Sequence, residues 1–349
     1  MTGRQETQER LESIVRKKLI GKPQYLIDYS KTFGDKTAVT KRDYINYIVD
    51  FLNYLEKELN YDISNVSCFK DVKTSTLNGY SEYIRYRIVK NEKGESIKKE
   101  NGERIRASRI YAIKDFFKFL YIDRYIDYNP SLEVSIPKNK NEIQVVALTE
   151  EEVQMLKQNI LSGVGSSKAI KRQAIWKNRD LAIVMIGLVT GLRVESIVEI
   201  NVSDIDFKSY SINVVEKGNK LRTCYIGQNT MNILEDWLED RSWMLNVDPN
   251  GDKCEALFLS SIKKNGSYTR ITTSGVGKLI RKYTQNIDKH ITPHKLRSTC
   301  ATTTYKHTGD IYLTASVLGH KNIQNTRRYA AVADSERKTT ATKLDNIFG

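Results

Sequence analysis

The chain has 349 residues, enough for two or three domains, and 40% of them are hydrophobic, so it can bury ordinary globular cores. Lys and Arg number 56 against 42 Asp and Glu, which gives a formal net charge of +14. This excess favours an anionic partner, either nucleic acid or, less often, an anionic membrane surface, although solubility alone is a third explanation.

The sequence also lacks the features of secreted, membrane-spanning and metal-binding proteins. The four cysteines are scattered without metal-ligand or redox spacing, and residues 1–19 contain no apolar signal-peptide core. The longest apolar run, residues 181–189, is too short to cross a bilayer. We therefore expect a soluble protein with reduced cysteines, located in the cytoplasm if the source is bacterial.

Most of the first half has the periodicity of helices. Residues 4–19 predict a short charged helix, and residues 40–59 predict an amphipathic one, in which apolar side chains recur every three or four positions. Thr40 is the expected N-cap of that second helix. A further helix is expected over residues 76–89, followed by a polar, exposed loop over residues 91–102.

The helix expected over residues 103–122 has two contrasting faces. Its apolar face includes Ile110 and Phe117 and should be buried. The opposite face is basic and carries Arg104, Arg106, Arg109, Lys114 and Lys118. Because phosphate contacts supply much of the affinity for DNA, these five residues are candidate phosphate-binding residues, with an ordinary solvated surface as the alternative.

A domain boundary is indicated near the middle of the chain. Asn129-Pro130 ends the helical region, and the basic segment that follows has the composition of a linker. We expect a helical domain over residues 1–136, a linker over residues 137–148 and a second domain over residues 149–349. Thr149, followed by three glutamates, is the expected N-cap of the first helix of that second domain.

The second half predicts helices around a small sheet. Strands are expected over residues 211–216 and 221–226, joined as a hairpin by Lys217-Gly218-Asn219-Lys220. Residues 163–177 predict a mobile basic loop. Helices are expected over residues 149–160, 180–189, 229–243, 273–284, 294–306 and 311–317, and the tail over residues 336–348 can form another. The expected fold class is mainly α with a small antiparallel β-sheet in the C-terminal domain (α+β).

Six residues of the second half could carry chemistry together, although each has an ordinary structural explanation alone. An arginine after a buried helix can satisfy carbonyls, a turn lysine is usually solvated, and a tyrosine near a helix is usually core or surface. His294 and Arg297 lie three residues apart after Pro293, so one helix face would offer both to a single anion. The six are Arg193, Lys217, His294, Arg297, His320 and Tyr329.

In this order, the six residues resemble the catalytic set of the tyrosine recombinases, the phage and transposon integrase family that includes the Xer proteins. The resemblance implies a recombinase catalytic domain over residues 149–349. The helical first half is similar, with less motif support, to the family's core DNA-binding domain. The resemblance further implies a two-domain clamp around double-stranded DNA and a homotetramer that exchanges strands. An accessory protein that bends DNA or sets direction is also compatible with it.

The resemblance also assigns roles to the residues. Arg193 and Arg297 would bind the non-bridging oxygens of the scissile phosphate, and His320 would donate a further hydrogen bond. Tyr329 would attack phosphorus, with His294 accepting or orienting its proton, and Lys217 would protonate the leaving 5′ oxygen. The product would be a 3′-phosphotyrosyl enzyme. Because one phosphodiester replaces another, neither ATP nor a metal cofactor is implied.

One residue departs from the family pattern. The third position after the first arginine is usually acidic in the family, but here it is Ser196, and the acid stands at Glu195. A shift of one position is about 100° around a helix, so Glu195 should face elsewhere. This leaves open what supports Arg193 and His294.

Two alternative functions remain at this stage. A type IB topoisomerase uses the same chemical groups but rejoins the original strand, and a catalytically idle regulator could share the fold. The His294 and Arg297 pair and the Leu318-Gly319-His320 element favour the recombinase, and the complete residue set argues against the idle regulator. The tail helix would dock either on its own domain or on a neighbouring subunit.

Overall fold

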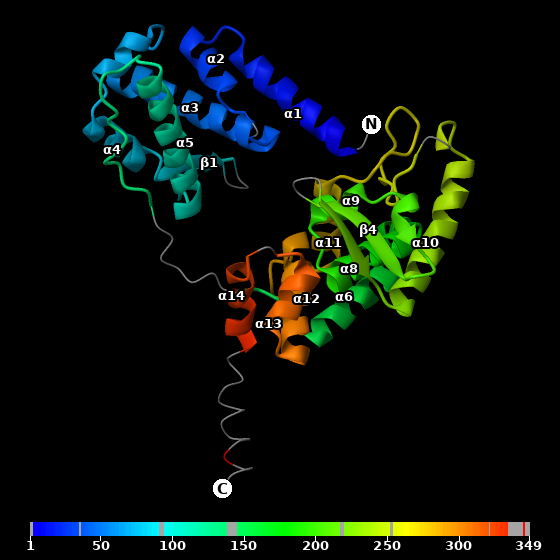
Figure 1. The fold of residues 1–349 in the computed structure, drawn as a ribbon. Coiled ribbons are helices and arrows are strands. Elements are labelled where there is room, and N and C mark those ends of the chain that lie inside the picture. Colours follow the sequence, from blue (N-terminus) through cyan, green and yellow to red (C-terminus); the bar gives the residue numbers. More distant parts are fainter. Residues whose placement is uncertain are drawn as a thin grey trace. The chain divides into compact units, whose positions relative to one another are not determined.

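The computed structural model describes residues 3–34, 36–90, 94–137, 145–216, 220–251, 254–320, 322–333 and 345. The chain divides into two compact units, Met1–Glu142 and Ile143–Gly349, which are described separately below. Figure 1 shows that helices dominate both units. The expected mainly helical fold is confirmed. Residues 138–144, which include most of the expected linker, lie outside the described residues.

Unit 1 is a helical bundle around an aromatic core. Rings from Tyr29, Phe51, Phe69 and Phe116 are fully buried and meet mostly edge to face, the arrangement that aromatic quadrupoles favour. The expected helix over residues 103–122 is confirmed by α5. The helices are α1 (Gly3–Leu19), α2 (Gln24–Lys31), α3 (Ala38–Leu59), α4 (Thr74–Tyr83) and α5 (Glu103–Ile122), with a short 3-10 helix over Val66–Lys70.

Three expectations for unit 1 were wrong. Helix α3 begins one turn early, because the Thr37 hydroxyl accepts the Thr40 backbone N–H at 3.3 Å and so caps it. The helix expected over residues 76–89 ends at Tyr83. It is followed by an antiparallel hairpin, in which β1 (Tyr86–Lys90) lies where the end of that helix had been expected and β2 (Ser96–Glu100) lies where the loop had been expected. The β-branched residues of this segment, which favour strands, account for the error.

Unit 2 places a small antiparallel sheet, in the order β3-β4-β5, beside a set of helices. The sheet is formed by β3 (Ile205–Asp206), β4 (Ser211–Glu216) and β5 (Lys220–Tyr225), and the expected hairpin pairs Ser211 with Tyr225. The helices are α6 (Glu150–Ser162), α7 (Ser167–Ala174), α8 (Lys177–Thr190), α9 (Val194–Glu199), α10 (Gln228–Asn246), α11 (Thr273–Tyr283), α12 (Pro293–Thr308), α13 (Ile311–Leu318) and α14 (Gln324–Ala333).

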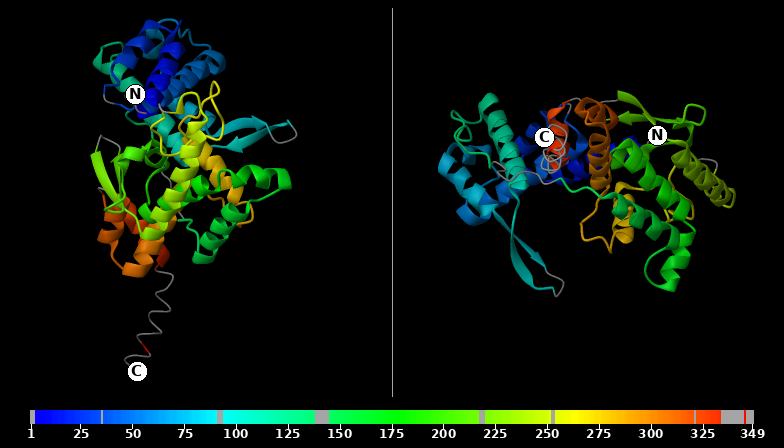
Figure 2. Two further views of the ribbon diagram at one scale, coloured as in Figure 1. Left: turned by 90° about the vertical axis from the view of Figure 1, so that its right-hand side faces the viewer. Right: turned by 90° about the horizontal axis from the view of Figure 1, so that it is seen from below.

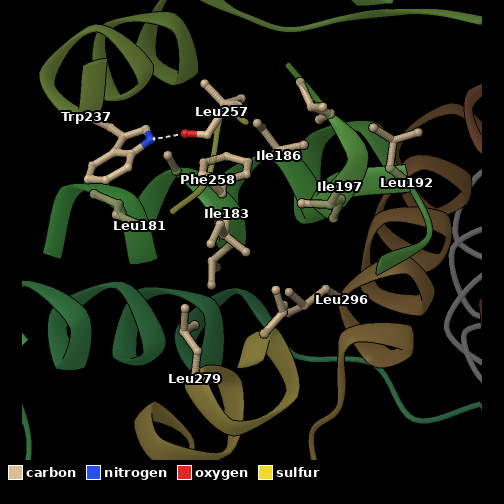
Figure 3. Packing of buried hydrophobic residues seen from close by; sticks show 14 of the residues in the cluster. Leu181, Ile183, Ile186, Leu192, Ile197, Trp237, Leu257, Phe258, Leu279 and Leu296 are labelled. Atoms are coloured by element: carbon tan, nitrogen blue, oxygen red, sulfur yellow. Dashed lines mark hydrogen bonds between the residues drawn. The ribbon is translucent and has the colours of Figure 1, made fainter. Parts of the chain in front are cut away.

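The core of unit 2 is built around α8. Figure 3 shows Ile183 and Ile186 of this helix among Leu279 and Leu296 from the helices that follow later in the chain. The indole N–H of Trp237 on α10 donates to the Leu257 carbonyl at 2.9 Å, which satisfies a polar group inside the core. Most residues of α8 are buried, so packing fixes the position of its C-terminal end. The first candidate residue, Arg193, follows directly after that end.

Several further expectations for unit 2 can be compared with the structure. The Thr149 N-cap is confirmed, since its hydroxyl accepts the Glu152 N–H at 3.2 Å. The mobile loop expected over residues 163–177 was wrong, because it contains α7, and the Gln173 amide bonds both backbone groups of Val164. The expected tail helix lies outside the described residues except for residue 345. Within the described part of the chain, no helix is long and apolar enough to span a membrane.

A glycine ends α8 and turns the chain toward the candidate site. Gly191 has a φ of 59°, a left-handed conformation that side chains other than glycine rarely adopt. A Cβ atom there would lie 2.6 Å from Leu318 Cδ2 and 3.1 Å from Cys300 Sγ. The chain therefore needs glycine at this position both for its backbone and for close packing against α12 and α13.

We predict that Gly191→Ala destabilises unit 2 more than Gly309→Ala does. Gly309 also ends a helix with a φ of 64°, but a Cβ there meets nothing within 4 Å. The control should lose about 1 kcal/mol from backbone strain, and Gly191→Ala should lose about 1–3 kcal/mol more from overpacking. Urea unfolding can be followed by tryptophan fluorescence, since all three tryptophans lie in unit 2. Equal losses in the two variants would contradict this reading of Gly191.

Candidate active site

Five of the six candidate residues lie in the described part of unit 2, and Lys217 lies outside it. Arg193 stands between α8 and α9, His294 and Arg297 lie on the first turns of α12, His320 follows α13 and Tyr329 lies on α14. Helix α12 packs against α8, α13 and α14. The four segments that carry these residues are therefore neighbours, although they span more than 130 residues of sequence.

Arg297 links two of these segments. Its side chain is buried, with 1% of the residue exposed. One terminal nitrogen donates to the Gly191 carbonyl at 2.5 Å and the other to the Leu318 carbonyl at 2.8 Å. Gly191 precedes Arg193 by two residues and Leu318 precedes His320 by two residues. A single guanidinium thus fixes the turns that present both side chains.

Arg297 retains capacity to bind an anion. A guanidinium has five N–H groups, and the two carbonyl bonds leave three. Burial, and then the nearby charge of Arg193, lower the pKa of Arg297 to about 10, so it stays protonated at neutral pH. A buried cation of this kind attracts a phosphate strongly, because little water is present to screen it.

A carboxylate from the sheet holds Arg193. The Arg193 guanidinium lies 3.5 Å from Glu216 Oε1, at the end of β4, and Arg222 of β5 donates to the same oxygen at 2.9 Å. Arg222 also donates to the carbonyls of Val317 and Thr190. Glu216 and Arg222 therefore tie the sheet to the turns that carry the candidate residues.

Gly319 allows this ion pair to lie close to α13. It has a φ of 65°, and a Cβ there would lie 2.8 Å from Arg222 Nη1 and 3.1 Å from Glu216 Oε2. A larger residue would displace the pair or the turn before His320.

The position that is usually acidic in the family has no carboxylate here. Ser196 is buried in α9, while Glu195 is exposed. The carboxylate next to Arg193 belongs to Glu216 instead. Glu216 and Arg222 were not among the residues predicted from the sequence, although an acid directly before Lys217 and an arginine five residues after that lysine were visible signals.

His320 is bonded to a buried threonine. Its Nδ1 lies 2.8 Å from the hydroxyl of Thr326, whose side chain is fully buried. Desolvation, followed by the charges of Arg297 and Arg193, lowers the pKa of His320 to about 4. The ring is therefore neutral at pH 7. If the Thr326 hydroxyl donates to Nδ1, the remaining ring proton lies on Nε2 and is available to an incoming oxygen.

His294 is likewise held in its neutral form. It lies in the first turn of α12, and the residue as a whole is exposed. Desolvation, then the charges of Arg328 and Arg297, lower its pKa. A neutral imidazole can accept a proton, whereas a charged one cannot.

Tyr329 lies in the same unit with its hydroxyl unsatisfied. The residue is 1% exposed and packs against Ala301 and Leu318. Its hydroxyl has no hydrogen-bond partner among the described residues, which is unusual for a buried polar group. The Arg328 guanidinium lies 5.1 Å from the ring centroid, and α14, which carries Tyr329, packs against the α12 helix of Arg297.

The five basic candidates on α5 have different surroundings within unit 1. The Lys114 ammonium donates to the carbonyls of Ser131, Leu132 and Val134, so it holds the chain after α5. Arg106 and Arg109 lie 3.9 and 3.3 Å from carboxylates of Glu82 and Asp50. Arg104 and Lys118 are exposed, and the structure gives neither a salt bridge within the described residues.

Two known proteins are similar to this chain over nearly its whole length. The tyrosine recombinase XerC of Caldanaerobacter subterraneus subsp. tengcongensis is 29% identical over 332 residues, covering 91% of this chain and 84% of the relative. The tyrosine recombinase XerS of Streptococcus agalactiae is 27% identical over 353 residues, covering 92% and 95%.

Solved structures show that the fold is shared. XerH recombinase in a post-cleavage complex with difH DNA has a TM-score of 0.63 at 18% identity and covers 90% of this chain and 83% of that one. The Tn1549 transposon integrase with circular-intermediate DNA has a TM-score of 0.60 at 20% identity, covering 88% and 95%.

The model of the phage integrase family matches residues 146–336, more than half of the chain. This match agrees with the position of all six candidate residues in unit 2 and with the full-length similarity to the two tyrosine recombinases. The chain therefore belongs to the phage integrase family, as a site-specific tyrosine recombinase that cuts and rejoins DNA.

Proposed function

We propose that this recombinase breaks a DNA strand through Tyr329 in a site organised by Arg297. The observation that carries the proposal is the buried hydroxyl of Tyr329, which has no hydrogen-bond partner among the described residues and stands on α14, the helix packed against the α12 helix of Arg297. A buried hydroxyl without a hydrogen-bond partner costs about 1–3 kcal/mol of stability. A phosphate oxygen bound by Arg297 would give the Tyr329 hydroxyl such a partner.

The proposed reaction exchanges one phosphodiester for another. The Tyr329 oxygen forms a bond to phosphorus, and the bond from phosphorus to the 5′ oxygen breaks. His294, which is neutral, takes the phenolic proton, and Lys217 gives a proton to the leaving 5′ oxygen. The product is a 3′-phosphotyrosyl enzyme with a free 5′ hydroxyl. Attack by the 5′ hydroxyl of another strand reverses each step and joins the new partner.

Fixed donors would stabilise the transition state. Arg193 and the remaining N–H groups of Arg297 bind the non-bridging oxygens, where negative charge grows, and His320 adds a neutral donor through Nε2. Thr326 would act as a positioning residue for that ring, since its hydroxyl selects the tautomer with the proton on Nε2.

Glu216 is proposed as the positioning residue for Arg193. Without a carboxylate, Arg193 and Arg222 would repel each other near a site that already holds Arg297. Glu216 neutralises part of this charge and fixes the direction of Arg193, the function that the resemblance gives to the missing acid at position 196.

We also propose the assembly and the biological use. A lambda integrase tetramer is bound to a Holliday junction and the Tn1549 integrase to circular-intermediate DNA. By analogy, this chain would act as a tetramer on double-stranded DNA and would integrate or excise a mobile element. The domain boundary at residues 137–148 and docking of the tail over residues 336–348 belong to the same proposal. So do DNA contacts by the basic residues of α5, namely Arg104, Arg106, Arg109, Lys114 and Lys118. An accessory protein that bends DNA or sets direction is compatible with it.

The first prediction concerns the nucleophile. Tyr329→Phe keeps the buried ring and removes only the oxygen, so the variant should bind DNA as the unmodified chain does and form no covalent adduct. The measurement uses nicked suicide duplexes that carry candidate junctions from the flanks of the gene, with adducts resolved by denaturing electrophoresis. Adduct formation by the unmodified chain should persist in EDTA. An adduct formed by Tyr329→Phe would refute the nucleophile assignment, and strict magnesium dependence would refute the metal-free mechanism.

The second prediction concerns the relocated acid. Glu216→Gln should slow adduct formation on the order of tenfold at saturating protein, equivalent to a charge-assisted interaction of about 1.5 kcal/mol, with DNA affinity little changed. Adding Ser196→Glu to that variant should restore part of the rate, because a carboxylate returns near Arg193. Glu195→Gln, at an exposed position next to Ser196 on α9, serves as the matched control. A rate that Glu216→Gln leaves unchanged would remove Glu216 from the mechanism.

A further inference from the structure

Unit 1 carries a β-hairpin that contributes nothing to its hydrophobic core. Strands β1 and β2 form a separate two-stranded sheet, and none of their residues is buried. In both views of Figure 2 this cyan hairpin projects away from the helices of its own unit. A two-stranded hairpin without further packing is only marginally stable in water, so its persistence in this position calls for a reason.

The base of the hairpin is fixed. Asn101 is buried directly after β2, where its side-chain amide donates to the Ile84 carbonyl at 2.9 Å. Its backbone N–H donates to the Arg85 carbonyl at 2.7 Å. The Arg85 guanidinium bonds the Glu100 carboxylate across the two strands at 3.0 Å. These contacts set the direction in which the rest of the hairpin extends.

The strands carry more positive charge than they neutralise. Arg87, Lys90, Lys98 and Lys99 stand on them, and the structure gives none of the four a salt bridge within its described residues. The one acid on the strands, Glu100, already bonds Arg85. Arg87 pairs directly with Lys99 across the strands, an arrangement that is destabilising unless an anion lies between the two charges.

Apolar side chains accompany these cations. Ile88 is 77% exposed, and Ile97 and Tyr86 are 45% and 41% exposed. The Lys98 ammonium lies 4.3 Å from the centroid of the Tyr86 ring. A two-stranded ribbon with basic and apolar side chains on both faces fits a groove lined by phosphates, since the major groove admits a β-ribbon of this size.

We propose that the β1–β2 hairpin is a DNA-binding arm that contacts phosphates of duplex DNA through Arg87 and Lys99. This inference rests on the chain's activity on DNA and is independent of the residue roles proposed for the active site. The arm adds affinity and places DNA against unit 1, and it takes no part in strand cleavage. Alternatively, the hairpin could pair with a second copy of the chain. The like charges on both strands disfavour such pairing.

The test compares two variants that lose the same charge. Arg87→Gln/Lys99→Gln removes the paired cations, and Lys57→Gln/Lys70→Gln removes two exposed lysines elsewhere in unit 1. The hairpin variant loses a repulsive pair, so it should fold as the unmodified chain does, and circular dichroism checks this. Binding to a fluorescent 40-base-pair duplex of random sequence is measured by anisotropy from low to moderate salt.

Each phosphate contact contributes about 0.9 to the slope of log affinity against log salt. The hairpin variant should therefore lose nearly two from that slope and bind on the order of ten times more weakly, while the control stays close to the unmodified chain. Adduct formation at saturating protein should be retained, which separates this result from failure of the active site. Identical salt slopes in the two variants would overturn the proposal. A change of oligomeric state in size-exclusion chromatography, with the slope intact, would overturn it in favour of contact between copies.

Discussion

The buried guanidinium of Arg297 is the interaction on which the site depends. It bonds the carbonyls of Gly191 and Leu318, which are 106 and 21 residues away in the sequence. A buried charge is costly unless it is hydrogen-bonded, and here two of the N–H groups of Arg297 bond the turns that present Arg193 and His320. Folding therefore supplies the geometry that phosphate binding requires, and the same residue serves stability and chemistry.

The site gathers several positive charges, which bear on the protonation of its histidines and on the role of Glu216. Desolvation is the largest cause of the lowered pKa of His320, and the charges of Arg297 and Arg193 lower it further, so the ring is neutral at pH 7. Neutral imidazoles can exchange protons with an attacking phenol or donate to a phosphate oxygen without adding to the repulsion. Glu216 holds Arg193 and Arg222, so one carboxylate from the sheet limits the electrostatic cost of assembling the cluster before DNA arrives.

Local patterns in the sequence predicted what depends on local physics. Helix α5 and the Thr149 cap follow from amphipathic spacing and capping chemistry, and the expected antiparallel pairing of the two strands is confirmed by the register of β4 and β5. The β1–β2 hairpin was missed because its few β-branched residues stand among charges. Glu216 and Arg222 were missed because Arg193 and Val317, which they contact, are distant in the sequence, so only packing brings these residues together. Thr326 lies six residues from His320, but no local pattern in the sequence indicates that their side chains bond.

The most direct test of this account is the stability of Arg297→Lys, measured by urea unfolding with tryptophan fluorescence. Lysine keeps the positive charge, but its single ammonium cannot span the carbonyls of Gly191 and Leu318 as the two nitrogens of the guanidinium do. The account predicts a loss on the order of 2 kcal/mol, the value of one charge-assisted hydrogen bond. Unchanged stability in this variant would show that Arg297 does not hold the site together.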